Sequence, residues 1–222
     1  MRIFTILLTS LLLSSCGSFL VDNSLAPPPP TRTDNGLVVS GYASQVPTVT
    51  SDAPEPVSTY QVLGAELGYQ FSDRNYLGVF FQHDENNGFA ARSTLSVKGW
   101  FRLNGKPKKW NHWMGFGLGS SWYDLYKPSL DDPDKGWLIY QQFRYAARYS
   151  FTEDFSGYIG TNTGFGFSGV SAYLNSTATL GLQYEFSKHF FATVAGNYGI
   201  TSAGEDQWYD TPGFQIGGSV RF

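Results

Sequence analysis

Most of the chain after Tyr60 alternates between apolar and polar residues with a period of two. Residues 172–186 show the pattern most clearly. One parity carries Leu174, Ala178, Leu180, Leu182, Tyr184 and Phe186, and the other carries Tyr173, Asn175, Thr177, Thr179, Gln183 and Glu185. Successive side chains of a β-strand point to opposite faces, so this period predicts strands with one apolar and one polar face. The predicted fold class is therefore all-β.

Nine segments carry this pattern. They are 60–71, the stretch around residues 77–81, 91–103, 109–123, 137–151, 155–167, 172–186, 189–201 and 213–222. Most are about 10–15 residues long, which exceeds the usual soluble strand and suffices to cross a bilayer at a tilt. A soluble β-sandwich would also alternate, and it stays the competing interpretation.

The connections between these segments alternate in length, and aromatic residues gather near the segment ends. SDRN, NGKPKK, TEDF and SKH are short, whereas DENNGFA, DLYKPSLDDPDKG and TSAGEDQWYDTP are longer. Outer-membrane barrels have short periplasmic turns, longer external loops and two aromatic girdles. The residues predicted to form the girdles are Trp110, Trp113, Trp122, Tyr123, Trp137, Phe151, Tyr184, Phe186, Phe190 and Phe191.

The last segment, GFQIGGSVRF, places Phe214, Ile216, Gly218, Val220 and Phe222 on one parity. It resembles the C-terminal signal of outer-membrane barrels, and this resemblance implies insertion by the barrel-assembly machinery through Phe214, Val220 and Phe222. As architecture the resemblance covers residues 58–222 and is close to the small OmpA/OmpX-type barrels. It implies an antiparallel transmembrane β-barrel.

The strand count is open between eight and ten. Nine segments are visible, whereas single-chain bacterial barrels have an even number of strands. Either the weaker stretch 36–44 is a tenth strand, or one segment is counted in excess and there are eight. A third option leaves nine strands and an N-terminus exposed at the cell surface. Ten strands are slightly favoured.

The N-terminus has the pattern of a secretory signal. Arg2 is followed by an apolar run of about ten residues, which is too short to span a bilayer as a helix, and then by small residues before Cys16. The sequence Leu13-Ser14-Ser15-Cys16 resembles the bacterial lipobox. This resemblance implies that Cys16 is acylated after residues 1–15 are removed, and that lipoprotein-sorting machinery is a partner. Gly17, rather than an aspartate, implies export to the outer membrane.

Residues 16–57 are predicted to form a disordered, lipid-anchored linker ahead of the barrel, because four consecutive prolines, Pro27 to Pro30, favour an extended spacer. Cys16 is the only cysteine, so the chain cannot form an internal disulfide. The formal net charge of -3 gives no reason to predict a nucleic-acid partner. No later segment has 18 consecutive apolar residues, so no transmembrane helix is predicted.

No catalytic, metal-binding or cofactor site is predicted. Enzymes that modify lipid A also use small barrels, but the deacylase type has an HxSN context that none of the three histidines matches. His83 and Asp84 at an external strand end, with Ser120 or Ser121 at the same level, are the nearest candidate for a palmitoyltransferase-like site. Residues 131–134 contain three aspartates, but their spacing is not that of an EF-hand.

The polar parity predicts charges inside the barrel. These residues are Glu66, Lys98, Arg102, Arg144, Arg148 and Glu185. Because an arginine or lysine facing lipid near the midplane costs about 2–4 kcal/mol, they are expected to face the lumen. The prediction is a salt-bridged network in the periplasmic half, beside Trp100, that blocks a continuous water pore.

The sequence thus predicts an outer-membrane lipoprotein with a structural or surface-interaction role, in contact with outer-membrane lipids and lipopolysaccharide. Two alternatives stay open. One is a lipid A-modifying enzyme, either an acyltransferase or a deacylase. The other is a narrow channel for small solutes, because ten strands leave more interior space than eight.

Overall fold

The computed structural model describes residues 35–50, 53–86, 90–106, 109–125, 134–168, 171–203 and 208–222. All regular secondary structure in these ranges is β-strand. The strands are β1 (Gly36–Thr50), β2 (Ala53–Gln70), β3 (Asn75–Asn86), β4 (Ala90–Arg102), β5 (Trp110–Leu125), β6 (Asp134–Ser150), β7 (Phe155–Ser168), β8 (Ser171–Glu185), β9 (Phe190–Ala203) and β10 (Trp208–Arg221). No helix in the described part of the chain is long and apolar enough to cross a membrane.

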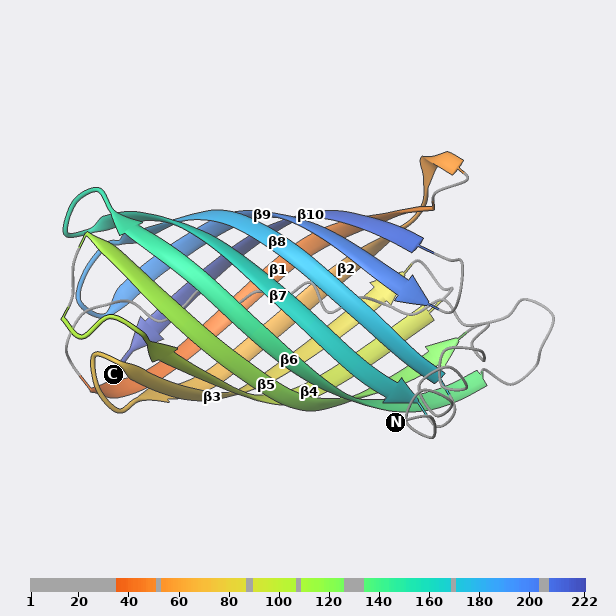
Figure 1. Cartoon of the computed structure of the whole chain (residues 1–222), viewed down its shortest axis with the longest axis horizontal. Helices are drawn as coiled ribbons and strands as arrows, with labels where there is room; N and C mark the ends of the chain where they lie inside the picture. Colours follow the sequence, from red (N-terminus) through yellow and green to blue (C-terminus); the bar gives the residue numbers. More distant parts are fainter. Residues whose placement is uncertain are drawn as a thin grey trace, which may run out of the picture.

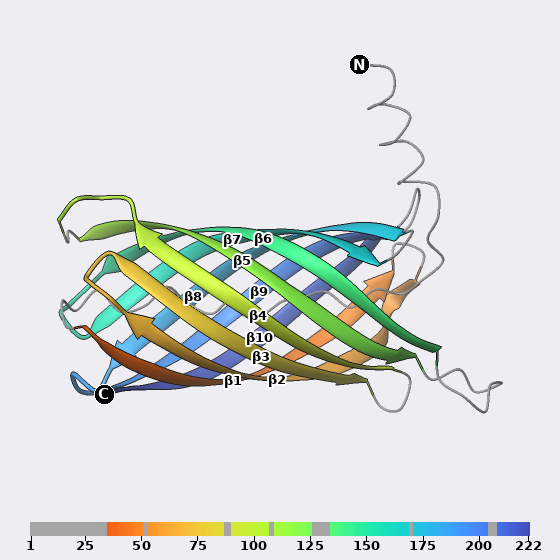
Figure 2. The ribbon, with the colours of Figure 1, turned by 90° about the horizontal axis from the view of Figure 1, so that it is seen from below.

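The ten strands form one closed barrel in which each strand pairs antiparallel with its neighbours in the sequence (Figures 1 and 2). The first and last strands close it, from Val38 opposite Arg221 to Gln45 opposite Phe214. Closure leaves no unpaired sheet edge. The all-β barrel is therefore confirmed, with the favoured count of ten strands.

The tenth strand corrects the predicted domain boundary. Residues 36–50 and 53–57 were assigned to the linker, but they belong to β1 and β2, so the barrel begins at Gly36 rather than at residue 58. The amphipathic signal of β1 is weak because apolar residues fall on both parities, with Leu37 and Val39 on one and Val38 and Tyr42 on the other. Pairing with β10 on one side and β2 on the other compensates for this weak local preference.

The first residue of β1 and the last residue of the chain lie at the same end of the barrel. Gly36 and Phe222 are located there with the turn residues 71–74, 103–106, 151–154 and 186–189, at the left of Figure 1. Phe222 donates its backbone N–H to Leu37 O at 2.9 Å, which ties the last residue to the start of β1. At the opposite end the strands continue into the sequences predicted as long loops, since β3 extends to Asn86 and β10 begins at Trp208.

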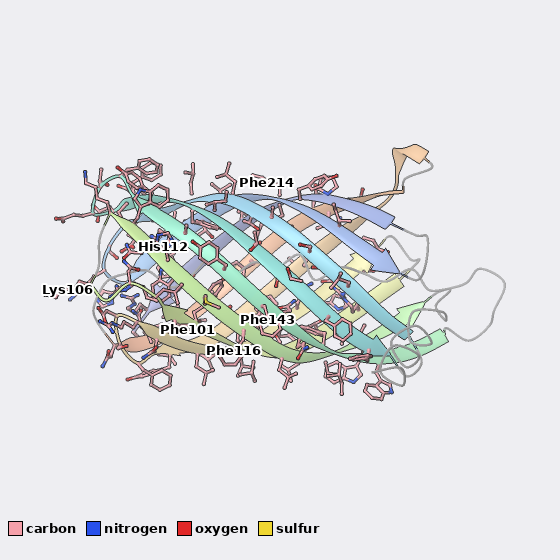
Figure 3. The ribbon with its side chains drawn as sticks, in the orientation of Figure 1. Phe101, Lys106, His112, Phe116, Phe143 and Phe214 are labelled. Carbon is pink, nitrogen blue, oxygen red and sulfur yellow. The ribbon has the colours of Figure 1, made fainter. Side chains whose placement is uncertain are left out.

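The outer face of the barrel is predominantly apolar. Phe101, Phe116, Phe143 and Phe214 point away from the barrel in Figure 3. Many other outward apolar side chains are at least one-third exposed, and they include Leu63, Leu67, Val79, Leu95, Leu118, Ile139, Ile159, Leu180, Ile216, Val220 and Phe222. A soluble protein rarely exposes so large a continuous apolar surface. This surface suits a hydrocarbon environment and argues against the soluble sandwich.

Aromatic residues lie near both ends of this surface. The outward members of the predicted girdles are Trp110, Trp122, Trp137, Phe151, Tyr184, Phe186 and Phe190. Trp113 and Phe191 instead point inward and are only 0% and 6% exposed, so their assignment to the girdles was wrong. Successive side chains of a strand point to opposite faces, and Trp113 is three residues from the outward Trp110. This odd spacing puts Trp113 on the inner face.

Candidate functional site

The interior of the barrel is the candidate site, because it gathers buried polar and charged side chains from all ten strands. The six charged residues predicted to face the lumen are all buried, with exposures between 0% for Lys98 and 5% for Glu185. Arg102, Arg148 and Glu185 lie near the short-turn end, whereas Glu66, Lys98 and Arg144 lie further along their strands.

Two of the predicted residues bind each other. Arg148 Nη2 donates to Glu185 Oε1 at 3.1 Å, joining β6 to β8 across the intervening β7. From β7, Ser156 Oγ accepts a hydrogen bond from Arg148 Nε at 2.9 Å. Three strands are therefore connected by one buried arginine.

The other four predicted residues bind groups that the sequence analysis did not assign to them. Tyr76 donates its hydroxyl to Glu66 Oε1 at 2.7 Å, and Lys98 Nζ lies 3.1 Å from the centre of the Phe80 ring. Trp100 is buried beside this group, because it pairs in register with Tyr76. Arg144 Nη2 donates to Gln142 Oε1.

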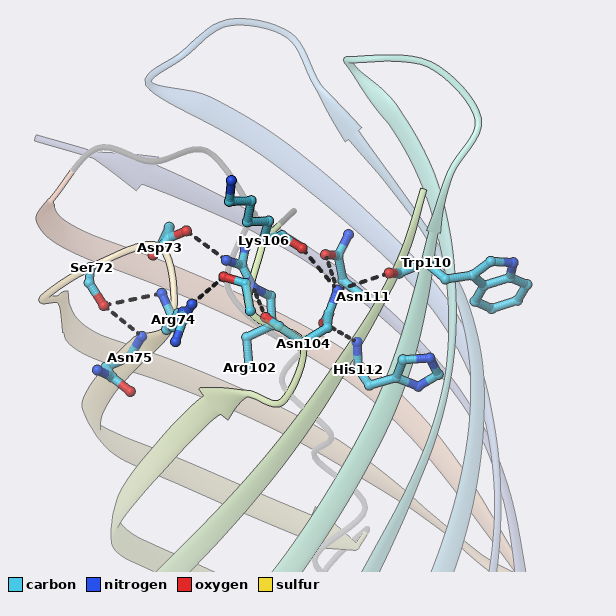
Figure 4. A network of polar contacts seen from close by, with 11 residues as sticks. Ser72, Asp73, Arg74, Asn75, Arg102, Asn104, Lys106, Trp110, Asn111 and His112 are labelled. Atoms are coloured by element: carbon cyan, nitrogen blue, oxygen red, sulfur yellow. Dashed lines mark hydrogen bonds and ion pairs between the residues drawn. The ribbon is translucent and has the colours of Figure 1, made fainter. Parts of the chain in front are cut away.

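Arg102 belongs to a separate polar cluster at the short-turn end (Figure 4). It donates to Asp73 Oδ2 at 2.6 Å and to the Asn104 carbonyl at 3.2 Å. The Asn104 side chain in turn donates to Asn111 Oδ1 and accepts from the His112 backbone N–H, both at 3.1 Å. These contacts hold the turn residues 71–74 and 103–106 together at the rim.

The sequence analysis missed a second buried ion pair. Arg92 on β4 donates through Nε and Nη2 to Asp84 Oδ2 on β3, and Gln82 Nε2 donates to Asp84 Oδ1. It also missed Arg221, which donates to Gln70 Oε1 at 2.8 Å. The alternation of side chains would have been enough to place both arginines inside the barrel. Arg92 is an even number of residues from the inward Lys98, and Arg221 directly follows the outward Val220.

Large aromatic rings fill much of the interior and pack over inward-facing glycines. A Cβ placed on Gly68 would overlap the Tyr76 ring, and one on Gly181 would overlap the Tyr158 ring. The buried aromatic residues inside the barrel are Tyr76, Phe80, Trp100, Trp113, Tyr140, Tyr158 and Phe191. A ten-stranded barrel has more interior space than side chains of average size fill, and these rings occupy part of it.

The residues considered for catalysis do not form one site. His83 points outward, where its Nδ1 lies 3.1 Å from Ser93 Oγ, whereas Asp84 points inward to Arg92. Ser120 and Ser121 also lie on opposite faces, and Ser121 shares a hydrogen bond with Thr94 inside the barrel. The described residues contain no group of three or more histidine, cysteine or acidic side chains suited to a metal ion.

The structure describes three of the four residues predicted for lipidation and membrane insertion. Phe214, Val220 and Phe222 all face outward, with 55%, 37% and 71% exposure. Cys16 and the three aspartates of residues 131–134 lie outside the part of the chain whose side chains are described.

Comparison with known proteins supports the architecture. Neither the protein-family models nor the curated proteins gave a match to this sequence. Among solved structures, an outer-membrane channel from Pseudomonas putida F1 is similar with a TM-score of 0.51 and 11% identity, covering 90% of this chain and 100% of that chain. The β domain of the Bordetella autotransporter BrkA gives a TM-score of 0.50 at 12% identity, covering 85% and 99%. The chain therefore has the fold of outer-membrane β-barrels.

Proposed function

We propose that this protein is an outer-membrane lipoprotein whose barrel has a structural or surface-interaction role rather than one in transport. The observation that carries this proposal is the filled interior. Phe80, Lys98 and Trp113 from three different strands are 0% exposed, and most of the other inward side chains are also buried. Side chains that line an open water pore would be accessible to solvent.

The placement in the outer membrane rests on the outer face and the fold. The barrel presents apolar side chains to its surroundings and buries its charges, which is the arrangement of a membrane-spanning barrel. Outer-membrane lipids and lipopolysaccharide are then its immediate partners. The outward Phe214, Val220 and Phe222 are proposed to be recognised by the barrel-assembly machinery.

Conductance measurements test the filled interior. We expect purified protein in planar bilayers to give at most rare and small conductance events, because buried rings and ion pairs occupy the described interior of the barrel. Steady single-channel steps would contradict the structural role. They would favour a narrow channel, the second candidate, which the similarity to the Pseudomonas putida channel suggests.

The lipid anchor is a separate part of the proposal. Residues 17–35 connect Cys16 to β1, which starts at the short-turn end of the barrel. Short turns lie on the periplasmic side of outer-membrane barrels. An acyl group on Cys16 in the inner leaflet would then be close to the start of the barrel.

Replacing Cys16 with serine is expected to abolish acylation, because the thiol is the group that accepts the lipid in a lipobox. Metabolic labelling with a palmitate analogue, followed by isolation of the protein, should give a labelled wild type and an unlabelled variant. A matched Ser15→Ala variant should keep its label. Incorporation of the analogue into the Cys16→Ser protein would refute the lipoprotein assignment and leave the barrel proposal intact.

A further inference from the structure

The buried charges inside the barrel do not balance. Among the side chains that the structure describes, the buried inward ones include six cations and three carboxylates, and all nine are at most 5% exposed. The cations are Arg92, Lys98, Arg102, Arg144, Arg148 and Arg221, and the carboxylates are Glu66, Asp84 and Glu185. Asp73, which is partly exposed in the turn 71–74, adds one negative charge at the rim. The described part of the interior therefore has an excess of positive charge.

The carboxylates are already bound to groups other than Arg144. Asp84 binds Arg92, Glu185 binds Arg148, and Glu66 accepts the hydroxyl of Tyr76. The hydrogen-bond partner of Arg144 among the described residues is Gln142, which is uncharged. Arg144 is 2% exposed, and its Nε and Nη1 have no hydrogen-bond partner. A buried guanidinium in this situation is strongly unfavourable without a compensating group.

Two further residues with unsatisfied groups lie in the same register row as Arg144, one on the neighbouring β7 and one on β4, two strands away. Asn162 lies directly opposite Arg144 in the ladder between β6 and β7, is 0% exposed, and has no hydrogen-bond partner for either amide atom. On the other side, Gly115 of β5 lies opposite Arg144 and Trp100 of β4 lies opposite Gly115. The Trp100 ring packs over Gly115, since a Cβ there would be 2.8 Å from it, and the indole Nε1 also lacks a partner.

Arg144, Asn162 and Trp100 thus lie in one register row across β4 to β7, and each carries an N–H donor without a hydrogen-bond partner. Side chains directly opposite in antiparallel strands have Cβ atoms about 4.5–5.5 Å apart, so one small group can lie between Arg144 and Asn162. Trp100 is two strands from Arg144, and the missing side chain of the intervening Gly115 leaves room for the Trp100 ring over that glycine. Nearby, a Cβ on the inward Gly164 would meet no atom closer than 3.6 Å, so the packing beside Asn162 is not tight.

We propose that Arg144, Asn162 and Trp100 bind a small monovalent anion of the halide class inside the barrel. Water can accept the same hydrogen bonds, but it leaves the positive charge of Arg144 uncompensated. A halide accepts hydrogen bonds from all three donors and neutralises one cation. This site goes beyond the proposed structural role, and it depends neither on the lipid anchor nor on the cellular role of the barrel.

Iodide is a suitable probe because it is a halide and quenches tryptophan fluorescence on contact. The full-length protein in zwitterionic detergent is titrated with sodium iodide at constant ionic strength. We expect a saturable quenching component that chloride reverses by competition. Trp100→Phe should remove this component because it removes the reporter, and Arg144→Gln should remove it because it removes the charge.

The control is the double variant Asp84→Asn/Arg92→Gln. It removes one buried ion pair of β3 and β4 and keeps the same excess of positive charge, so the saturable component should persist. Should Arg144→Gln fail to fold, Asn162→Ala takes its place and is expected to weaken iodide affinity about tenfold, because it removes one hydrogen bond to an ionic ligand.

Two results would overturn the proposal. One is purely linear quenching in the wild-type protein, which would mean that only water occupies this region. The other is a saturable component that is unchanged in Arg144→Gln or in Asn162→Ala. Conductance in planar bilayers is read independently, so failure of the anion site and failure of the structural role remain distinguishable.

Discussion

Replacing Arg148 with methionine is expected to lower the free energy of unfolding of the barrel by about 3–5 kcal/mol, because it removes one member of a buried ion pair and leaves the Glu185 carboxylate without the Arg148 guanidinium. Both side chains are almost fully buried, and the ion pair joins β6 to β8. The substitution also removes the hydrogen bond that Arg148 donates to Ser156 on the intervening β7. The measurement is urea unfolding in phospholipid vesicles, followed by tryptophan fluorescence.

The matched control removes both charges. The double variant Arg148→Met/Glu185→Leu removes both members of this ion pair, so much of the lost stability should return, as it does when other buried ion pairs are replaced by apolar residues. A single variant as stable as the wild type would mean that water reaches Glu185. The described burial of this part of the interior would then be wrong.

The alternation of side chains allowed most of the fold to be predicted. In residues 91–103 it assigned Lys98 and Arg102 to the interior, where the structure buries both, and Leu95 and Val97 on the opposite parity are each 45% exposed. The physical reason is strong, since a one-residue shift would turn every charge of the strand toward lipid. The two aromatic errors, Trp113 and Phe191, came from proximity to a strand end and disregarded the same parity.

The start of the barrel was harder to predict, because β1 is specified by its neighbours. Its first residues alternate only weakly, with Ser40 inward and Gly41 outward. The strand is fixed by pairing with β10, which is distant in the sequence. The paired residues Val38 and Arg221, for example, are more than 150 residues apart. The expectation of an even strand number argued against nine strands and left eight or ten, and the weak stretch 36–44 made ten the slightly favoured count.

The partners of the interior charges depend on the relative register of strands, which one sequence does not reveal. Arg148 and Glu185 are separated by a whole strand and meet only because both side chains reach across β7. Asp84 was considered as a rim residue beside His83, whereas the ladder between β3 and β4 pairs it directly with Arg92. Parity identified which residues are inside, and register decided which of them bind.

Replacing Leu180 with arginine is expected to destabilise the barrel by about 2–4 kcal/mol in a bilayer, because this position faces the hydrocarbon region. Leu180 is 70% exposed on β8, and its register partners are Ile159 on β7 and Gly196 on β9. It lies four residues before Tyr184 in the girdle of the short-turn end. At about 3.3 Å per residue and a strand tilt of roughly 40°, this spacing puts it about 10 Å into an apolar band about 25 Å tall.

A second arginine at a different depth separates the effect of the membrane from that of the substitution itself. Leu103 is half exposed in the turn after β4, between Arg102 and Asn104 in the sequence. Arginine there reaches the interface, so Leu103→Arg should cost at most about 1 kcal/mol. Both variants are unfolded by urea in vesicles of the same lipid. Equal stability losses would show that Leu180 does not face lipid, because a protein that exposes this surface to water would tolerate an arginine at either position.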